Sequence, residues 1–409
     1  MLSRPRPLST LLGLIFCFFL YVRHNGVPAP EINCPSPPSV ETDASVGSHD
    51  TCACPSLFES PSLEFTDELK SKRLVKRDGS EIDQKGDDVK TDVVPRLMQA
   101  SMISGHEPGS PHERCLETHM RHGERWGHPT HILRQNLVPG YHNGAFNKAA
   151  HLLNIIMGEM TKDADKRSEW IFWLDADTIL LNPEIPKTLF LPPDDFAEVY
   201  FLGPKDWEGF NAGGFFIRVN DWSIKILTEV MAVPLLKPEI DLKYNAVANA
   251  MKWVFTKPEY RDHVLYQPRR WYNDFRSNEH PEAESGSLLV HFDGTLDENS
   301  RAIEPWLDAI EQRPSDWQVP VQDTSFPGEV EKYWRNLRVA KMELEHFIPH
   351  DIDEPAGKWD SDDKDMVALA AARVNLWWAV REDAQDSKLI ESLLQENEEL
   401  RKKTEHSEI

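Results

Sequence analysis

The sequence from Trp170 to Leu181, WIFWLDADTILL, decides the fold. An unbroken apolar run followed by carboxylates is typical of a strand that is covered on both faces, in the middle of a mostly parallel sheet. In open α/β sheets the ligand binds beyond the carboxyl ends of such strands. Asp175 and Asp177 fall at that end, and two oxygen ligands there suit Mg²⁺ or Mn²⁺, which can hold a diphosphate. The alternative is a polar turn that closes a core strand, because an Asp-x-Asp triplet is common by chance.

Strands and helices alternate before this stretch. We expect a strand at Leu97–Ile103, a helix at Glu113–Glu124, a strand at Thr130–Leu133 and a helix capped by Asn143. This order predicts an α/β fold with a doubly wound parallel sheet. Further along, the pattern predicts strands at Val199–Leu202, Phe215–Val219 and Leu288–Gly294, a helix capped by Asp221 and a second helix at about Asp241–Phe255.

The composition describes a globular, acidic protein. Its 409 residues are 40% hydrophobic and include 13 Trp, enough for a large core. The formal charge of −23 argues against nucleic acid as a partner. It leaves a phosphorylated substrate open, because a bound divalent cation can supply local positive charge.

The N-terminus resembles a membrane-targeting segment. Arg4 and Arg6 precede a charge-free run at Leu8–Val22, and bulky residues end that run. We expect residues 1–23 to form a short cytoplasmic tail and an uncleaved signal-anchor, whose short span suits the membranes of the early secretory pathway. A cleaved signal peptide is the alternative. Residues 24–92 are rich in Pro, Ser, Asp and Lys and read as a flexible stem.

The cysteines fit a lumenal location. Cys34, Cys52, Cys54 and Cys115 follow the apolar run, and four cysteines on that side of a membrane have the number for two disulfides, with the pairing left open.

The sequence pattern changes near Pro314. Residues 313–409 are charged and helical in pattern, with apolar residues in Met366–Val380 and again near the C-terminus. We expect a helical C-terminal extension that packs back on the preceding domain, residues 93–312. A short coiled coil is the alternative.

Five stretches in one order resemble a known family. They are Glu169–Pro183, Gly209–Arg218, Trp222–Ser223, Gln267–Asn273 and Leu289–Gly294. Together, over residues 93–312, they are similar to the fungal α-galactosyltransferase/α-mannosyltransferase family, glycosyltransferase family 34, which includes plant xyloglucan xylosyltransferases. The resemblance implies a GT-A type fold, a nucleotide-sugar donor, dependence on Mn²⁺ (or Mg²⁺), retention of anomeric configuration and a single-pass type II protein of the Golgi membrane.

The resemblance also implies a set of metal ligands. Asp177 is the expected direct ligand, Asp175 contacts the metal or the ribose, and His291 supplies a third ligand from a later strand. The departing nucleoside diphosphate builds up negative charge, which a divalent cation neutralises. A lone histidine at a strand end is otherwise an ordinary core or surface residue.

Other residues are expected around the substrates by the same resemblance. On the donor side we expect Lys148 and the turn residues Asn211, Gly213 and Gly214, where a small backbone lets a sugar ring approach. A structural turn and a solvated lysine are the alternatives. On the acceptor side we expect charge and a stacking platform from Arg269, Arg270 and Trp271, with a surface turn as the alternative.

One departure from the family pattern concerns catalysis. Family members commonly carry an acidic-Gln pair where this chain has Val247-Ala248, so neither side chain can act as base or nucleophile. Asp241 is the candidate substitute, although helical geometry would place it one and a half turns away.

The sequence therefore predicts a hexosyltransferase that uses UDP-galactose or GDP-mannose and a glycan acceptor. The first alternative is a catalytically impaired scaffold subunit of a Golgi hetero-complex that synthesises mannan. A remote alternative is a haloacid-dehalogenase-type phosphatase, which shares the Asp-x-Asp-x-Thr pattern at Asp175 but needs a later Gly-Asp-x-x-x-Asp run that does not follow here.

Overall fold

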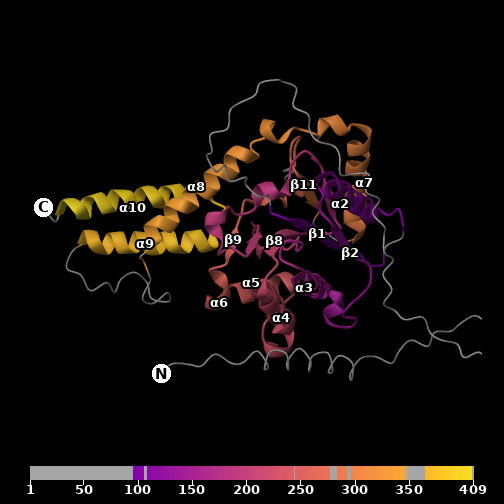
Figure 1. The fold of residues 1–409 in the computed structure, drawn as a ribbon, viewed down its shortest axis with the longest axis horizontal. Helices are drawn as coiled ribbons and strands as arrows, with labels where there is room; N and C mark the ends of the chain where they lie inside the picture. The colour runs from indigo at the N-terminus through magenta and orange to yellow at the C-terminus, as the bar shows by residue number, and fades with distance from the viewer. Residues whose placement is uncertain are drawn as a thin grey trace, which may run out of the picture. The chain divides into compact units, whose positions relative to one another are not determined.

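The computed structural model describes residues 95–105, 108–243, 245–276, 283–292, 296–345, 347 and 364–407, which all belong to one compact unit, Val93–Ile409 (Figure 1). The expected anchor (1–23) and stem (24–92), with Cys34, Cys52 and Cys54, lie outside the described residues. Within the described ranges, no helix is both long enough and apolar enough to cross a membrane.

A six-stranded sheet forms the centre of this unit. Its order is β2-β1-β3-β8-β5-β9, with bounds β1 Leu97–Met102, β2 Thr130–Leu133, β3 Trp170–Leu174, β5 Phe201–Gly203, β8 Gly214–Arg218 and β9 Val264–Tyr266. Every residue of β3 is buried, as the apolar run predicts. An α/β fold with a mostly parallel sheet is thereby confirmed.

The prediction of a doubly wound parallel sheet is wrong at β8. This strand runs antiparallel to both of its neighbours, β3 and β5. A buried strand is apolar in either direction, so the residue pattern carries no sign of its orientation. The link from β5 to β8 contains only the hairpin of β6 (Lys205–Asp206) and β7 (Gly209–Phe210), and a parallel return needs a longer crossover.

Helices pack around the strands of this unit. They are α2 Pro111–Trp126, α3 Asn147–Met160, α4 Asp221–Leu236, α5 Ala246–Phe255, α6 Pro258–Arg261 and α7 Leu296–Gln312. In Figure 1, α3, α4 and α5 follow one another along one side of the sheet, and α2 lies beside α7, in agreement with their contacts. Short 3₁₀ turns occupy His142–Gly144, Lys187–Phe190, Asp194–Phe196, Arg269–Trp271, Pro314–Asp316 and Val321–Asp323.

Three expected helix starts differ from the structure. Asn143 lies in a 3₁₀ turn, and α3 begins four residues later at Asn147 without a side-chain cap. The cap of α4 is Asn220, whose side chain accepts a hydrogen bond from Ser223 N, with Asp221 as the first helical residue. Asp241 precedes α5, which begins at Ala246. Asn and Asp favour caps and turns alike, so composition alone does not fix these boundaries.

A second, three-stranded sheet joins the large one through the Asp-Ala-Asp turn. Its order is β10-β11-β4, with β10 Phe275–Arg276, β11 Leu289–Phe292 and β4 Thr178–Leu180. The strand expected at Leu288–Gly294 is therefore β11, and its last two residues, Asp293 and Gly294, lie outside the described residues.

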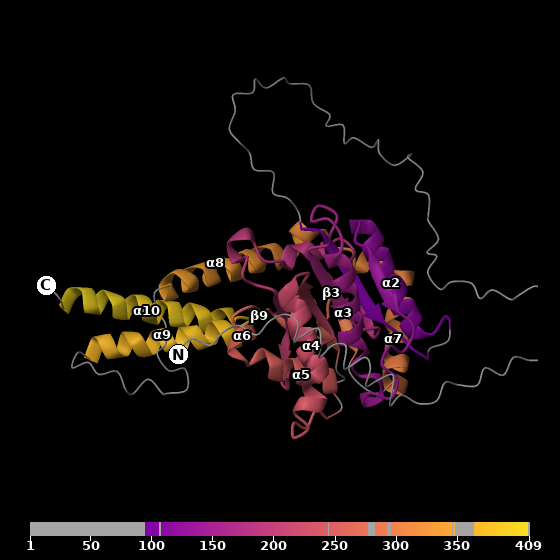
Figure 2. The same ribbon diagram turned by 60° about the horizontal axis from the view of Figure 1, so that its bottom comes forward.

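The C-terminal helices pack together and against the sheet. They are α8 Phe326–Leu344, α9 Lys364–Glu382 and α10 Ser387–Ser407. Figure 2 shows the three side by side, and α9 also contacts β9 at the edge of the large sheet. A helical C-terminal region that packs back on the preceding residues agrees with these contacts.

Candidate metal centre

The Asp-Ala-Asp turn connects the two sheets. Strand β3 ends at Leu174 and β4 begins at Thr178, so Asp175 and Asp177 occupy the link between them. Asp175 N donates to Gly213 O at 2.9 Å, and Thr178 N donates to Asp175 O at 3.2 Å. These backbone bonds fix the turn at the carboxyl end of β3, where the sequence predicts it.

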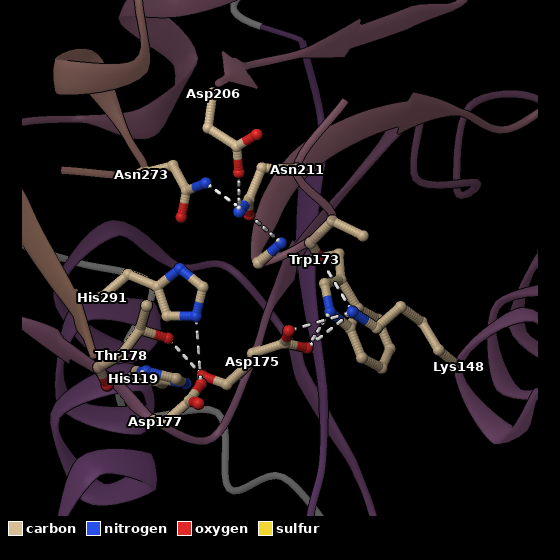
Figure 3. A network of polar contacts seen from close by, with 12 residues as sticks. His119, Lys148, Trp173, Asp175, Asp177, Thr178, Asp206, Asn211, Asn273 and His291 are labelled. Atoms are coloured by element: carbon tan, nitrogen blue, oxygen red, sulfur yellow. Dashed lines mark hydrogen bonds and ion pairs between the residues drawn. The ribbon is translucent and has the colours of Figure 1, made fainter. Parts of the chain in front are cut away.

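Strand pairing brings His291 to Asp177. Strands β11 and β4 are antiparallel, with His291 opposite Thr178, and Phe292 N donates to Asp177 O at 3.0 Å. As a result, His291 Nε2 lies 3.4 Å from Asp177 Oδ1 (Figure 3). One potential ligand atom each from Asp175, Asp177 and His291 lies within 4.8 Å of the others. The three residues that were predicted as metal ligands are therefore brought together.

This donor set fits a hard or borderline divalent cation. Two carboxylates and one imidazole suit Mn²⁺, and carboxylates alone suit Mg²⁺. Ligands about 2.1 Å from one ion are at most about 4.2 Å apart. The 4.8 Å spread of the cluster is within a small side-chain rotation of that limit. The residues fit a metal ion, and the identity of the ion belongs to the proposal below.

Electrostatics link His291 to Asp177. Burial favours the neutral imidazole, but the Asp177 carboxylate outweighs burial and raises the pKa of His291 above its ordinary value. Burial likewise favours the protonated Asp177, but the positive charge of His291 outweighs it and lowers the pKa of Asp177. Because an imidazole binds a metal ion only in its neutral form, metal binding here competes with protonation of His291.

Asp175 is held by two partners. Lys148 Nζ, from the first turn of α3, lies 2.8 Å from Asp175 Oδ1 and 3.0 Å from Oδ2, and it donates to Ala212 O at 2.7 Å. Trp173 Nε1 donates to Asp175 Oδ1 at 2.7 Å. The Lys148 side chain is only 7% exposed, so it is not a solvated lysine on a helix surface. It lies within the site where donor contacts were expected.

Asn211 organises the opposite wall of the site. Its Nδ2 donates to Asp206 Oδ2 at 2.8 Å, while its Oδ1 accepts from Gly213 N at 2.9 Å and from Asn273 Nδ2 at 2.8 Å (Figure 3). Asp206 and Asn273 were not predicted as site residues. Asn273 ends one of the five stretches that carry the resemblance, so that stretch was the signal for it.

Gly213 and Gly214 permit close approach of chain segments. A Cβ at Gly213 would lie 2.3 Å from His291 Cε1 and 2.5 Å from His291 Nδ1. A Cβ at Gly214 would lie 2.6 Å from Tyr272 O. Only glycine fits at these positions, because real Cβ atoms do not approach other atoms so closely. Gly213 therefore sets the position of the His291 ring, with Nε2 turned to Asp177.

A further unpredicted residue, His119, supports the turn from α2. Its Nε2 donates to Thr178 O at 2.8 Å, which leaves Nδ1 to accept from the Ser101 hydroxyl at 3.1 Å. The side chain is fully buried, and burial lowers the pKa of His119 to about 3. Neutral His119 thus connects β1, α2 and the first residue of β4. Nothing in the local sequence distinguishes it from other core histidines.

The expected acceptor platform is wrong for Trp271. This side chain is 1% exposed, stacks on Phe190 with ring centroids 5.6 Å apart, and donates from Nε1 to Glu329 at 3.0 Å. No face of its ring remains for a sugar. Arg270 is exposed and forms an ion pair with Glu329, and the Arg269 guanidinium lies over the Phe275 ring at 4.6 Å.

The structure gives Asp241 no described link to the metal centre. It is an exposed residue before α5, and its Oδ1 accepts a hydrogen bond from Lys243 N. The helical spacing assumed for it is wrong because the helix starts at Ala246. Val247, in the first turn of α5, is buried and apolar.

Comparisons with known proteins point to one family. Residues 193–302 match the model of the galactosyl transferase GMA12/MNN10 family. An alpha-1,2-galactosyltransferase of Schizosaccharomyces pombe is 26% identical over 181 residues, 35% of this chain and 47% of that protein. A probable glycosyltransferase 6 of Oryza sativa subsp. indica is 30% identical over 77 residues, 18% of this chain and 16% of that protein. The chain thus spans less than half the length of these curated relatives.

Solved structures of two glycosyltransferases also resemble the chain. One is involved in glycosylation of the major capsid of PBCV-1; it is 18% identical, with a TM-score of 0.41, covering 51% of this chain and 99% of that one. The other is GlyE of Streptococcus pneumoniae TIGR4, 13% identical with a TM-score of 0.30, covering 55% of this chain and 65% of that one.

The family match over residues 193–302 relates the chain to a class of protein, the glycosyltransferases. Within that class, residues 193–302 match the galactosyl transferase GMA12/MNN10 family, and this match confirms the resemblance to family 34 seen in the sequence. The matched range includes Asn211, Gly213, Asn273 and His291. The Asp-Ala-Asp turn precedes it in the chain and joins it through strand pairing.

Proposed function

We propose that this protein transfers a hexose, galactose or mannose, from a nucleotide-sugar to a glycan acceptor, with Mn²⁺ or Mg²⁺ held by Asp175, Asp177 and His291. The observation that carries the proposal is the convergence of these three side chains, whose ligand atoms lie within 4.8 Å of one another. They lie beside Gly213, where a Cβ would clash with the His291 ring. The family match and the galactosyltransferase activity named for the fission-yeast relative support the choice of reaction.

Each residue has a role in this proposal. When bound, the cation neutralises the negative charge that develops on the departing diphosphate. Lys148 neutralises Asp175 and fixes the position of its carboxylate. Asn211 holds the turn that contains Gly213, so that the backbone leaves room for the donor sugar. The GT-A type of fold and retention of configuration are parts of the same proposal.

We assign the acceptor side to Trp207 in place of Trp271. Trp207 lies in the turn between β6 and β7, next to Asp206, and its side chain is 71% exposed. Its ring centroid is 5.6 Å from that of Phe275, which is 5.2 Å from that of His291. A row of rings therefore leads from the surface to the metal centre, and an exposed indole offers a face on which a sugar can stack.

The cellular setting is proposed from the sequence alone. A Golgi type II protein with its N-terminal anchor at residues 1–23 and its described unit in the lumen would meet nucleotide-sugars and glycans there.

A scaffold subunit is the second candidate function. The buried, apolar Val247 occupies the place of an acidic residue of the family, and Asp241 has only a local contact in the described structure. A protein of this kind would bind the donor without turning it over, and would act within a hetero-complex.

Donor hydrolysis separates the two functions. The full-length protein in detergent is incubated with UDP-galactose or GDP-mannose and Mn²⁺, and release of the nucleoside diphosphate is measured without acceptor. We expect slow hydrolysis of one donor that stops with EDTA. Binding of a donor without hydrolysis, and without transfer to any acceptor tested, would identify the scaffold.

Two variants assign the activity to the metal centre. Asp177→Asn should reduce hydrolysis by about 100-fold or more, because a loss of transition-state charge stabilisation of this kind is worth two to three orders of magnitude. Asp163→Asn, which changes an exposed aspartate in the loop before β3 while the turn follows that strand, should leave the rate unchanged. Equal rates for the two variants would refute the proposed role of Asp177.

A further inference from the structure

A cavity of about 220 Å³ lies between the β6–β7 hairpin, α5, β9 and the end of α9. None of Asp175, Asp177 and His291 lines it. A water molecule takes about 30 Å³ in the liquid, so the cavity is large enough for a small molecule. Its apolar wall includes Phe210, Phe255 and Tyr266.

The cavity is positively charged in an acidic protein. Four cationic side chains line it, against one carboxylate, Glu382, which gives a formal charge of +3. The whole chain carries −23. The cationic residues are Lys205, Lys252, Arg261 and Arg381. A local excess of positive charge against such a background attracts anions.

Protein carboxylates satisfy only half of these cations. Lys205 Nζ lies 2.7 Å from Glu382 Oε2, and Arg381 Nε donates to Asp262 Oδ1 at 2.8 Å. Lys252 Nζ donates to a backbone carbonyl, Glu208 O, at 2.8 Å. Arg261 Nε is buried and makes no hydrogen bond within the described chain, and Asp262 Oδ1 is 4.0 Å away.

Burial makes this imbalance costly. The side chains of Lys205, Arg261 and Arg381 are only 17–19% exposed, so they have lost most of their water. A partly desolvated cation needs a partner of opposite charge. Among the described residues, the buried Arg261 Nε has no hydrogen-bond partner, and the exposed Lys252 at the rim of the cavity donates only to a backbone carbonyl.

We propose that this cavity binds an oxyanion of the phosphate class, either inorganic phosphate or the phosphate of a phosphomonoester. Lys252 and Arg261 are the donors to its oxygens, and the ring wall contacts whatever the phosphate carries. This site stands independently of the proposed transferase activity, because it shares no residue with the metal centre.

The hairpin places this site next to the catalytic one in the chain. Successive side chains of a strand point to opposite faces. On β6, Lys205 lines the cavity while the following residue, Asp206, bonds to Asn211 at the metal centre. An anion bound in this cavity therefore lies beside the same two-residue strand that positions Asn211.

The test is a phosphate titration of the full-length protein in detergent by isothermal titration calorimetry. EDTA is present so that no divalent cation binds phosphate. We expect one saturable site. Its affinity for phosphate should fall with added NaCl, because salt screens the attraction between opposite charges. Glucose 6-phosphate and glucose are titrated in parallel. Tighter binding of glucose 6-phosphate than of phosphate identifies a phosphomonoester as the ligand, equal binding identifies phosphate itself, and glucose should not bind.

Three variants locate the site. Lys252→Met should weaken phosphate binding about tenfold, the usual effect of losing one charge-assisted hydrogen bond. Lys225→Met, on the exposed face of α4, should leave it unchanged. Glu382→Gln removes the one lining carboxylate and should tighten binding, which a folding defect cannot do. Absence of saturable binding in the wild type, or equal affinities in the Lys252 and Lys225 variants, would overturn the proposal.

Discussion

At the scale of single residues, the metal centre depends on the absence of a side chain at Gly213. The His291 ring occupies the space in which a Cβ at this position would lie, and Asn273 Oδ1 is 3.0 Å from the same point. The positions of the metal ligands are therefore set by steric fit as well as by charge.

Gly213→Ala should weaken metal binding while the protein stays folded. The added methyl group displaces the His291 ring from Asp177, because the backbone on both sides is fixed by hydrogen bonds. We expect a loss of Mn²⁺ affinity of at least about 10-fold, the range seen when ligand support is removed, measured by titration of bound Mn²⁺. Gly158→Ala, an exposed position of α3 with nothing near its Cβ, is the control and should bind Mn²⁺ as the wild type does.

Trp207→Ala should weaken binding of the acceptor and leave donor hydrolysis unchanged. Loss of one ring face removes a contact of about 0.5–1.5 kcal/mol, so the KM for the acceptor should rise by up to about tenfold. The rate of donor hydrolysis without acceptor should not change. Trp207→Phe should restore most of the affinity. A change in donor hydrolysis instead would place the indole on the donor side.

The three metal ligands that the sequence identified share one property: they carry chemistry at the end of an apolar strand. Asp175, Asp177 and His291 were visible for that reason. Asp206 has no such marker, since its role comes from Asn211, five residues on, across a hairpin. Trp271 follows two arginines and so resembled a surface aromatic residue, and only its packing against Phe190 and α8 reveals a core residue.

At the scale of elements, α2 stabilises the start of β4 through His119. The imidazole must stay neutral, because Nδ1 accepts a hydrogen bond and burial lowers the pKa of His119 to about 3. The unfolded chain takes up a proton near pH 6.5, while the folded chain does not. Because of His119, the free energy of unfolding decreases as the pH falls from 6.5 toward 3.

His119→Gln should flatten the pH dependence of stability. In the wild type, His119 should lower the free energy of unfolding by about 2 kcal/mol at pH 5 relative to neutral pH. The variant should not show this decrease. Urea unfolding at pH 7 and pH 5 measures the difference. His142→Gln, at an exposed position, is the control. An unchanged difference between the two pH values in the His119 variant would contradict the assigned neutral state.

Elements with a strong local signal were predicted well. The strand β2 has the expected bounds, and β1 ends one residue early. The direction of β8 was not predictable, because orientation depends on which neighbour a buried strand pairs with and on the length of the connection. The start of α5 was missed because Asp241 offers a plausible cap five residues before the first helical residue.

At the scale of the whole molecule, the C-terminal helix α8 shares a core with the sheet. Phe326, Tyr333 and Trp334 of α8 belong to the same buried cluster as Phe172 of β3 and Phe216 of β8. Tyr333 also donates from its hydroxyl to Tyr266 O of β9 at 2.9 Å. The domain boundary between residues 312 and 313 remains a prediction. Because of these contacts, we expect α8 to fold together with the sheet.

Trp334→Ala should therefore destabilise the whole described unit. The side chain is 4% exposed, and truncation of a buried aromatic residue typically costs about 3–5 kcal/mol. Chemical unfolding followed by fluorescence should show one transition at lower denaturant. Met342→Ala, 75% exposed on the same helix, should change stability by less than about 0.5 kcal/mol. Two separate transitions in the wild type would mean that α8 folds apart from the sheet.

The central claim is that Asp177 and His291 share one divalent cation. Anomalous X-ray diffraction from a crystal of the protein soaked in MnCl₂ tests it most directly. We predict a single strong manganese peak bounded by Asp175, Asp177 and His291, and its loss in Asp177→Asn crystals. A map with no peak at these three side chains, in crystals that hold manganese elsewhere, would contradict the account.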